Sequence, residues 1–573
     1  MSQEPHFNLV EDAKNKIDEL INEACKKART AGELPEGAPL SGSVEIPRDP
    51  SHGDYAATHA MAAAKELKLA PRNIAETIIK FIDLGESCFE KISIAGPGFI
   101  NFTVSEVWFG DVLKAVEAAG DNYGAVDIGK GQRVMVEYVS ANPTGPMTIG
   151  NARGGALGDT LASVLEKAGF TVWREFLLND AGNQVDLFGK SIDARYMQLC
   201  LGEENVEFPE DGYHGDDIKE LAKMIYDTEG ESLKELSEQE RIEKFKEFGL
   251  TYNVKQMKEH LERYRIEFDE WFKESSMHES GYVSETVELL DRAGLLYEKD
   301  GAQWLSNIAL GGEKDEVIRR SNGFNTYYAM DIAYHRNKLE RGFDKAIEIW
   351  GADHHGHARR LMTTLSSPEL NKALGIDSTK LHFLLMQMVR ILRDGETVKV
   401  SKRTGKALTL NDLLDEIPVD ACRFFFNTRA DSHLEFDISL AVRQDSENPV
   451  YYVQYAHARI CSLIDMLAED GFNVPLYNEI TPGLLSSEAE HELIKQIAQL
   501  PEEVKNAARD YDPSKINKYA VELAARFHKF YSSCRIKNEP PTLLTARLKL
   551  ADTTRTVIKN CLDILKITAP RKM

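Results

Sequence analysis

The spacing of apolar and polar residues alternates between helical and strand-like periods along the chain. Residues 13–27 place apolar side chains at helical spacing and predict an amphipathic helix. Residues 91–102 predict two short strands joined by a Gly-Pro-Gly turn. Residues 133–140 predict a strand that leads through a small-residue turn into a helix beginning near Ala152, and residues 171–178 predict the next strand. This order is typical of one half of a parallel nucleotide-binding sheet.

The rest of the pattern predicts where this sheet is interrupted and where it ends. Residues from about 200 to 300 are highly charged and have helical spacing, so we expect a helical insertion between two halves of one sheet. Strand-like runs resume at 326–333, 346–351 and 382–392. From Asn411 onward the pattern is almost entirely helical and predicts a C-terminal bundle. The fold class expected is therefore α/β followed by an all-α domain.

Composition limits the classes to which the protein can belong. The 573 residues include 42% hydrophobic and 28% charged side chains, as in a soluble protein with several packed domains. No apolar run is long enough to predict a membrane span, and the first residues lack the pattern of a secretory signal. The seven cysteines are scattered without a C-x-x-C pair, which favours reduced thiols in a cytoplasmic protein and removes the usual thiolate zinc sites.

The charge distribution leaves two interpretations open. A net charge of −23 argues against a nucleic-acid partner, because phosphate contacts need Lys and Arg. Residues 519–573, however, contain 11 Lys or Arg against 4 Asp or Glu, a local balance of +7. A basic patch on an acidic body can bind RNA locally, but charge alone favours a solvated helical face.

Two short stretches carry candidate chemistry. The T-I-G-N turn, N-P-T-G-P-M-T-I-G-N at 142–151, lies between a predicted strand and helix, where backbone N–H groups can approach a polyphosphate. The cationic loop, V-K-V-S-K-R-T-G-K at 398–406, places three cations around a serine. Each is ambiguous alone, because such turns often only reverse the chain and Lys-rich loops mostly face solvent. Together they suit attack at the α-phosphate of ATP, where charge builds on the leaving pyrophosphate.

These stretches resemble the H-x-G-H and K-M-S-K-S signatures of class I aminoacyl-tRNA synthetases. Further stretches are similar to one family of that class, the arginyl-tRNA synthetases. They are residues 53–56, 95–102, 137–146, 350–357, 448–460 and 567–573. The resemblance therefore covers essentially the whole chain.

The resemblance implies a fold and a reaction. It implies an N-terminal α/β tRNA-contact domain over residues 1–110, a Rossmann-like catalytic domain over 111–410 and a helical anticodon-binding domain over 411–573. The reaction implied is ATP-dependent ligation of L-arginine to tRNA(Arg) through an arginyl-adenylate, with Mg²⁺ on the phosphates and no zinc. The partners are then tRNA(Arg), arginine and ATP, and the protein is expected to be a cytoplasmic monomer that binds neither DNA nor a membrane.

Selection of arginine makes a specific physical demand. A guanidinium is planar, always charged and carries five N–H donors, so it needs a carboxylate in a fixed pose. Asp331 matches the family position for this carboxylate, and Tyr327, four residues earlier, can bond the same ligand. Without the resemblance, a helix cap or a surface carboxylate would be the favoured interpretation of Asp331.

The resemblance assigns the other site residues by position. For arginine they are Glu137, Ser140, Asn142, Tyr327, Asp331 and His354. For ATP they are Pro143, Gly145, Pro146, Thr148, Gly150, Asn151, Arg153, Lys399, Ser401 and Lys402, with Thr148, Asn151, Lys399, Ser401 and Lys402 also catalytic. For tRNA they are Phe99, Asn101, Tyr451, Tyr455 and Arg459.

The chain departs from the family pattern at both signatures. Thr148 and Asn151 stand where the family has histidines, and their hydroxyl and amide groups can also donate hydrogen bonds to ATP. In the cationic loop, Val400 replaces the methionine and Arg403 the final serine, whereas both lysines are present.

Two other classes remain open at this point. A cysteinyl-type synthetase shares the fold, but that family uses a Cys/His zinc site for which this sequence has no set of ligands. An inactive paralogue that only binds RNA or a partner would explain the lost histidines, although the retained lysines and glycines argue against it. His354, His355 and His357 could ligate zinc, but no cysteine or second histidine cluster completes a tetrahedral set.

Overall fold

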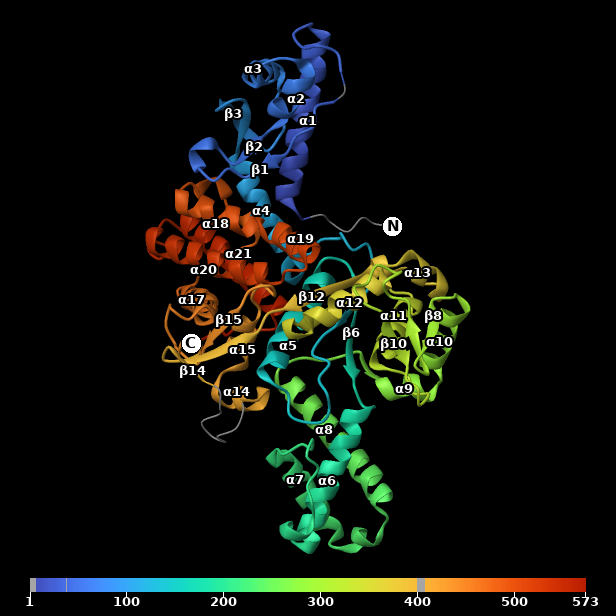
Figure 1. Cartoon of the computed structure of the whole chain (residues 1–573). Coiled ribbons are helices and arrows are strands. Elements are labelled where there is room, and N and C mark those ends of the chain that lie inside the picture. Colours follow the sequence, from blue (N-terminus) through green and yellow to red (C-terminus); the bar gives the residue numbers. More distant parts are fainter. Residues whose placement is uncertain (1–6, 38, 399–407) are drawn as a thin grey trace.

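The computed structural model describes residues 7–37, 39–398 and 408–573. Figure 1 shows a domain from the N-terminal part of the chain at the top, a parallel sheet in the middle and a helical arm at the bottom. A helical bundle from the C-terminal part of the chain lies beside the sheet and below the N-terminal domain. No helix within the described residues is long and apolar enough to cross a lipid bilayer.

The N-terminal domain packs three helices on a small antiparallel sheet. The helices are α1 (Leu9–Thr30), α2 (His59–Leu67) and α3 (Pro71–Phe81). The strands are β1 (Val44–Glu45), β2 (Tyr55–Ala57), β3 (Phe89–Ala95) and β4 (Phe99–Val104), in the order β1-β2-β4-β3. The helix expected over 13–27 and the strand pair expected over 91–102 are confirmed. Helix α4 (Glu106–Ala119) then leads into the central sheet.

The central sheet has five parallel strands in the order β12-β11-β5-β6-β7. Their bounds are β5 (Arg133–Glu137), β6 (Thr171–Leu178), β7 (Glu270–Lys273), β11 (Lys345–Gly351) and β12 (Leu381–Met386). Along the chain, β6 and β7 are added in turn on one side of β5, and β11 and β12 are then added on its other side. The strand order therefore reverses between β5 and β11, which is where doubly wound sheets bind ligands.

Three sequence-based expectations about the elements were wrong. Residues 326–333 are not a strand but the start of helix α11 (Tyr327–Glu340), capped by Thr326, whose hydroxyl accepts from the Ala329 N–H. This helix is buried on several sides, and a short apolar run does not distinguish a buried helix from a buried strand. The insertion is not helical throughout, because β7 belongs to the central sheet. Residues 382–392 form parts of two strands, β12 and β13 (Val389–Arg393), rather than one.

Two further structural units are inserted between strands of the central sheet. The arm consists of α6 (Asn183–Leu201), α7 (Asp216–Glu229) and α8 (Glu238–Arg263), which share a separate apolar core. After β7 come α9 (Glu274–Glu279) and α10 (Tyr282–Arg292). They are followed by an antiparallel sheet of β8 (Leu296–Lys299), β9 (Ala302–Leu305) and β10 (Glu316–Arg319). Helices α12 (His355–Leu365) and α13 (Pro368–Leu374) connect β11 to β12.

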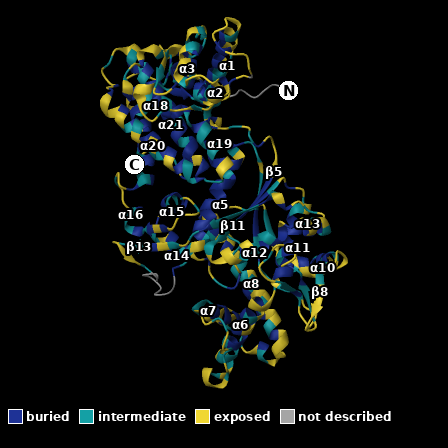
Figure 2. Cartoon of the chain, turned by 45° about the horizontal axis from the view of Figure 1, so that its top comes forward, coloured by how far each residue is buried: buried dark blue, intermediate teal, exposed yellow. Residues whose placement is uncertain are grey.

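The last part of the chain is mostly helical, as expected, with one exception. Strand β15 (Leu434–Asp437) pairs in parallel with β13, whose other neighbour is β14 (Glu396–Thr397). Short helices α14 (Leu410–Glu416), α15 (Val419–Phe426) and α16 (Ile438–Ala441) flank it. The bundle contains α17 (Pro449–Glu469), α18 (Glu488–Ala498), α19 (Leu500–Asp510), α20 (Ser514–Ser533) and α21 (Pro541–Ile564). Figure 2 shows buried residues concentrated in the sheet and inside the bundle.

Helix α5 (Ile149–Lys167), which follows the T-I-G-N turn, packs unusually closely on the chain beyond β5. Its glycines make this approach possible: a Cβ on Gly158 would lie 2.2 Å from Cγ of Tyr138, and a Cβ on Gly155 would lie 2.7 Å from Ile266. Real Cβ atoms do not come this close to other atoms, so these two positions fix the depth at which α5 sits.

Substitution of Gly158 tests this packing. Alanine within a helix normally stabilises by about 0.5–1 kcal/mol relative to glycine. Gly158→Ala should instead lower the free energy of unfolding by about 1–3 kcal/mol, because its methyl group overpacks against Tyr138. Gly356→Ala in α12 is the matched control, since the nearest atom to its Cβ would be 3.8 Å away. Urea unfolding of both variants measures the difference; equal stability of the two would contradict the close-packing argument.

Candidate functional site

The predicted site residues gather at the carboxyl ends of β5 and β11. Glu137 ends β5, and the T-I-G-N turn and α5 follow it. Tyr327 and Asp331 lie on the first turns of α11, which packs beside these strand ends, and His354 follows β11 in a short 3-10 turn, Ala352–His354. The crevice outside this edge, where the strand order reverses, is the expected place for a nucleotide ligand.

The connection from β5 to α5 contains strained backbone and a helix cap. Val139 and Ser140 have φ angles of 70° and 41°, which non-glycine residues rarely adopt and which are found preferentially at functional sites. Thr148 is the N-cap of α5 and forms a capping box with Asn151: the Thr148 N–H donates to Asn151 Oδ1 at 2.8 Å. This box uses the amide oxygen of Asn151 and leaves its NH₂ group for other partners.

The segment that follows the cationic loop contacts the T-I-G-N turn, although the two are far apart in sequence. The Leu410 N–H donates to the carbonyl oxygen of Met147 at 2.9 Å, and Thr148 forms a β-bridge with Thr409. Thr409 and Leu410, which begin helix α14 a few residues after the cationic loop, are thus hydrogen-bonded to the T-I-G-N turn. Lys399, Ser401 and Lys402 themselves lie outside the described residues.

The other residues of the T-I-G-N turn differ in accessibility. Pro146 and Gly150 are exposed and Gly145 is half-buried, whereas Pro143 is buried. Asn253 of α8 stabilises the turn, because its side-chain amide donates to the Pro143 carbonyl oxygen at 2.8 Å. A ligand above the turn would therefore meet backbone and small side chains.

Arg153 was expected to contact ATP, and the structure contradicts this. Its side chain is completely buried, and its guanidinium donates to the carbonyl oxygens of Gln387, Arg429 and Ser432 at 2.6, 2.9 and 2.9 Å. The donors are thus occupied by the loops that flank β13. Arg153 connects α5 to the segment from which the cationic loop extends.

The Asp331 side chain lies on α11, is partly exposed to solvent and forms a hydrogen bond with His357. Its Oδ2 atom lies 2.8 Å from Nε2 of His357, whose ring stacks on Trp350 with an interplanar angle of 9°. Tyr327, one turn before Asp331, is 52% exposed. The carboxylate and the phenol thus lie on the same side of α11, which is the arrangement a guanidinium ligand requires.

His354, expected at the amino-acid site, does not contact Asp331. Its side chain is 63% exposed and lies 3.6 Å from Asp353. The family resemblance also puts His357 in the pocket, but the residues assigned to arginine from the sequence include only His354 of the three close histidines. The helix start at His355 orients His357 towards α11.

The Glu137 carboxylate is buried, and both of its oxygens have partners within the protein. Ser140 donates to its Oε1 at 2.8 Å, and the Tyr334 hydroxyl lies 2.9 Å from its Oε2. The Lys338 ammonium forms an ion pair with the same Oε2 and, at 2.7 Å, with Glu348. Glu137 therefore forms the floor of the site and has little capacity left for a ligand.

This floor is a row of three carboxylates across three strands. Glu175, Glu137 and Glu348 are direct neighbours in register on β6, β5 and β11, and all three are buried. Helix α11 and its C-cap residue cover them with four side chains: Tyr334, His335, Lys338 and Arg341. Buried carboxylates need such partners, because an unpaired buried charge is strongly unfavourable.

The pKa shifts follow from this arrangement. Burial raises the pKa of Glu137, although the Lys338 charge opposes the shift. Burial would lower the pKa of Lys338, but the surrounding carboxylates raise it above its ordinary value, so the ammonium stays charged. Burial also acts to raise the pKa of Glu348, but the charges of His335 and Lys338 outweigh it and hold this pKa below its ordinary range.

Asn142 is exposed at the edge of the site and is held from both sides. Asn179 donates to its amide oxygen at 2.8 Å, and its own NH₂ group donates to Gln184 Oε1 at 2.7 Å. Asn179 belongs to the connection between β6 and α6, and Gln184 belongs to the first turn of α6; the sequence-based interpretation included neither.

The residues expected to contact tRNA fall into two groups. In the N-terminal domain Phe99 is half-buried, but Asn101 is only 3% exposed because β4 is an inner strand. The expected base contact by Asn101 is therefore not available on the surface. In the bundle, Tyr451, Tyr455 and Arg459 lie along one face of α17: the two tyrosine rings stack at 6.0 Å, and the guanidinium of Arg459 lies over the Tyr455 ring at 4.5 Å.

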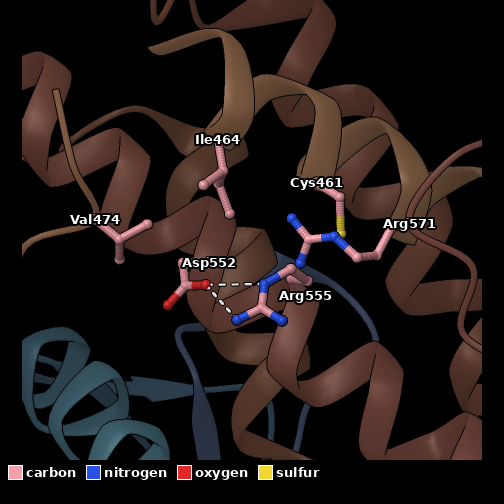
Figure 3. A pocket seen from close by; sticks show the side chains of 6 residues that line it. All are labelled: Cys461, Ile464, Val474, Asp552, Arg555 and Arg571. Carbon is pink, nitrogen blue, oxygen red and sulfur yellow. Dashed lines mark hydrogen bonds and ion pairs between the residues drawn. The ribbon is translucent and has the colours of Figure 1, made fainter. Parts of the chain in front are cut away.

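A pocket of about 280 Å³ lies elsewhere in the bundle (Figure 3). It is lined by Cys461, Ile464, Val474, Asp552, Arg555 and Arg571. Arg555 pairs with Asp552 at 2.7 Å, and Arg571 pairs with Asp465 at 3.0 Å. The pocket therefore combines an apolar wall with guanidinium groups that are held in place by acidic neighbours.

His354, His355 and His357 are close in sequence and are metal ligands by residue type. Within the described ranges, no group of three or more His, Cys, Asp or Glu side chains is arranged to hold a metal ion. His357 makes its hydrogen bond to Asp331, and His354 points to Asp353.

Comparisons with known proteins match three family models in succession along the chain. Residues 15–104 match the arginyl tRNA synthetase N terminal domain, residues 113–438 the catalytic domain of tRNA synthetases class I (R), and residues 453–573 the DALR anticodon binding domain. The chain is 50% identical over 568 residues to an arginine–tRNA ligase of Acetivibrio thermocellus, covering 99% of this chain and 100% of the relative. It is 48% identical to that of Ruminiclostridium cellulolyticum, with the same coverage.

Solved structures show the same fold. Thermus thermophilus arginyl-tRNA synthetase superposes with a TM-score of 0.71 at 20% identity, covering 98% of this chain and 100% of that one.

Removal of the Lys338 charge tests the buried floor. Lys338→Met keeps most of the volume but leaves Glu137 and Glu348 without their shared cation, so the free energy of unfolding should fall by about 3–5 kcal/mol. Lys223→Met on α7 is the control: its pair with Asp227 is 66% and 59% exposed, and its loss should cost less than about 1 kcal/mol. Urea unfolding followed by circular dichroism gives both values. Wild-type stability of Lys338→Met would show that the ion network does not stabilise the sheet.

Proposed function

This chain belongs to the arginyl-tRNA synthetase family, whose members ligate L-arginine to tRNA(Arg) with ATP, and we propose how its residues divide that work. The observation that carries the proposal is that Asp331 and Tyr327 share one side of α11, whose Tyr334 and Lys338 contact Glu137 at the end of β5. A carboxylate for the guanidinium thus lies on a helix that is fixed to the strand leading into the T-I-G-N turn. The enzyme is an arginine–tRNA ligase with a class I catalytic domain.

In the first step, ATP lies on the T-I-G-N turn with its phosphates near the N-terminus of α5. The arginine carboxylate attacks the α-phosphate, pyrophosphate leaves, and arginyl-adenylate forms. Lys399 and Lys402 stabilise the charge that develops on the pyrophosphate, and Ser401 donates to it. The hydrogen bond between Leu410 and Met147 supports this role, because it holds the segment directly after the cationic loop at the turn. Mg²⁺ enters with ATP, since it is usually held by substrate phosphates and water rather than by a protein cage.

In the second step, a hydroxyl of the 3′-terminal ribose of tRNA(Arg) attacks the carbonyl carbon of the adenylate. The arginyl ester forms and AMP leaves. Thr148 and Asn151 take the place of the family histidines at the nucleotide: once ATP is present, the NH₂ group of Asn151 and the α5 backbone N–H groups are the available donors.

The arginine side chain lies over Asp331 and Tyr327 in this proposal. Glu137 supports the pocket from below, because its oxygens are bound by Ser140, Tyr334 and Lys338. Ser140 therefore acts through Glu137, and Asn142 remains the polar group at the pocket edge.

The bundle binds the anticodon loop. Stacked aromatic rings with a guanidinium, as at Tyr451, Tyr455 and Arg459, bind unpaired bases well because every base has a π-face. Phe99 offers a second stacking surface on the N-terminal domain. We also propose that the protein acts as a cytoplasmic monomer without a DNA partner and that the domains divide near residues 110 and 410.

The proposal is tested by ATP–pyrophosphate exchange with and without tRNA(Arg). The wild-type protein should exchange pyrophosphate with arginine when tRNA(Arg) is present. Asp331→Asn keeps the shape but removes the charge, so arginine binding should weaken by about 2–5 kcal/mol, which is at least about 30-fold in KM. The KM for ATP should stay near its wild-type value.

Asp227→Asn, an equivalent change on the exposed face of α7, is the control and should leave both constants unchanged. Exchange with cysteine in place of arginine, or silence with tRNA(Arg) present, would overturn the proposed reaction. An unchanged arginine KM in Asp331→Asn would overturn only the assignment of this carboxylate.

A further inference from the structure

Residues 179–184, which are the connection between β6 and α6 and the first two residues of α6, face the site from the strand next to β5. Asp180 fixes its course, because the Ser275 N–H and hydroxyl both donate to this carboxylate at 2.9 Å. The segment therefore does not hang freely over the site. It is tied to the start of α9, beyond the adjacent strand β7.

The close approach of Gly182 to Tyr327 is the first notable feature of this segment. Gly182 has φ 87° and ψ −176°, a conformation that only glycine adopts without strain. A Cβ at this position would lie 3.0 Å from the Tyr327 hydroxyl and 3.4 Å from its Cε1 atom. Because half of the Tyr327 side chain is exposed, the Gly182 backbone is one of the surfaces that decide where its ring lies.

The second feature is the hydrogen-bond chain through Asn142. Asn179 donates to Asn142, and Asn142 donates to Gln184, at 2.8 and 2.7 Å. The two partners stand at either end of the same short segment. The direction of the chain fixes the Asn142 amide, so that one N–H and one lone pair of this group remain for a ligand.

We propose that residues 179–184 form a side wall of the amino-acid pocket, with Gly182 and Gln184 as positioning residues for arginine. The inference rests on the proposed function, which assigns Tyr327 and Asn142 to the arginine pocket. One rigid segment touches both of them, so it sets the distance between the two contacts. Gly182 affects arginine binding by positioning the Tyr327 ring, and Gln184 affects it by orienting the Asn142 amide.

A purely structural role for Gly182 is the competing explanation, since any residue with positive φ favours glycine. Gly230 offers a matched control at the end of α7: it has φ 59°, and a Cβ there would meet nothing within 4 Å. Gly230→Ala reports the cost of the backbone conformation alone. Gly182→Ala adds the contact with Tyr327.

The experiment compares the KM for arginine, the KM for ATP and kcat in tRNA-dependent exchange for these variants. Gly182→Ala should raise the arginine KM about tenfold or more, because a displaced Tyr327 loses one hydrogen bond to a charged ligand. The KM for ATP and kcat should change little, and Gly230→Ala should leave all three constants unchanged. In a Tyr327→Phe background the effect of Gly182→Ala on the arginine KM should become smaller, since the hydroxyl is the closest atom.

A second pair of variants keeps the test decisive if Gly182→Ala does not fold. Gln184 is exposed, so its replacement should not disturb the core. Gln184→Ala removes the acceptor for Asn142 and should raise the arginine KM severalfold, whereas Gln184→Glu keeps an acceptor oxygen and should retain arginine affinity. If both Gly182→Ala and Gln184→Ala had the wild-type KM for arginine, the proposal that residues 179–184 form a wall of the pocket would be wrong. The proposed reaction would not be affected. Failure of the wild-type enzyme to use arginine would instead overturn the reaction itself.

Discussion

The structure depends on one constraint: three neighbouring strands of a buried parallel sheet each carry a glutamate on the same face. Glu175, Glu137 and Glu348 cannot be left as unpaired charges, and α11 supplies the phenol, imidazole, ammonium and guanidinium that satisfy them. The helix is thereby fixed over the sheet edge in one orientation. Since Tyr327 and Asp331 are on the same helix, the ion network also fixes the position of the proposed guanidinium site.

A second buried charge connects the catalytic sheet to the bundle. Asp159, on α5, forms ion pairs with Arg423 of α15 at 2.6 Å and with Lys566 near the C-terminus at 2.8 Å. Two turns earlier, Arg153 ties the same helix to the loops around β13. Helix α5 therefore starts at the proposed nucleotide site and is held along its length by the segments that carry the cationic loop and the anticodon-binding bundle.

Much of the fold could be predicted because local patterns determine it. The T-I-G-N turn follows a strand and begins a helix as expected, and residues 171–178 form a strand. The strand prediction for residues 326–333 was wrong, because an apolar run that is buried on several sides has no period that distinguishes a helix from a strand. Strand β7 was missed because its four residues lie within a long charged region, and only the pairing with β6 identifies it.

The sequence by itself determined the family and the chemical types at the site: a carboxylate for the guanidinium, a phenol near it, small residues at the turn and lysines in the loop. Only the tertiary structure decided which of these groups are free to act. It buried Arg153 and Asn101, occupied Glu137 with Lys338, and brought His357 rather than His354 to Asp331. The physical reason is that availability depends on hydrogen bonds and burial between residues far apart in the chain, such as Glu137 and Lys338. These contacts exist only once strand order and helix orientation are fixed.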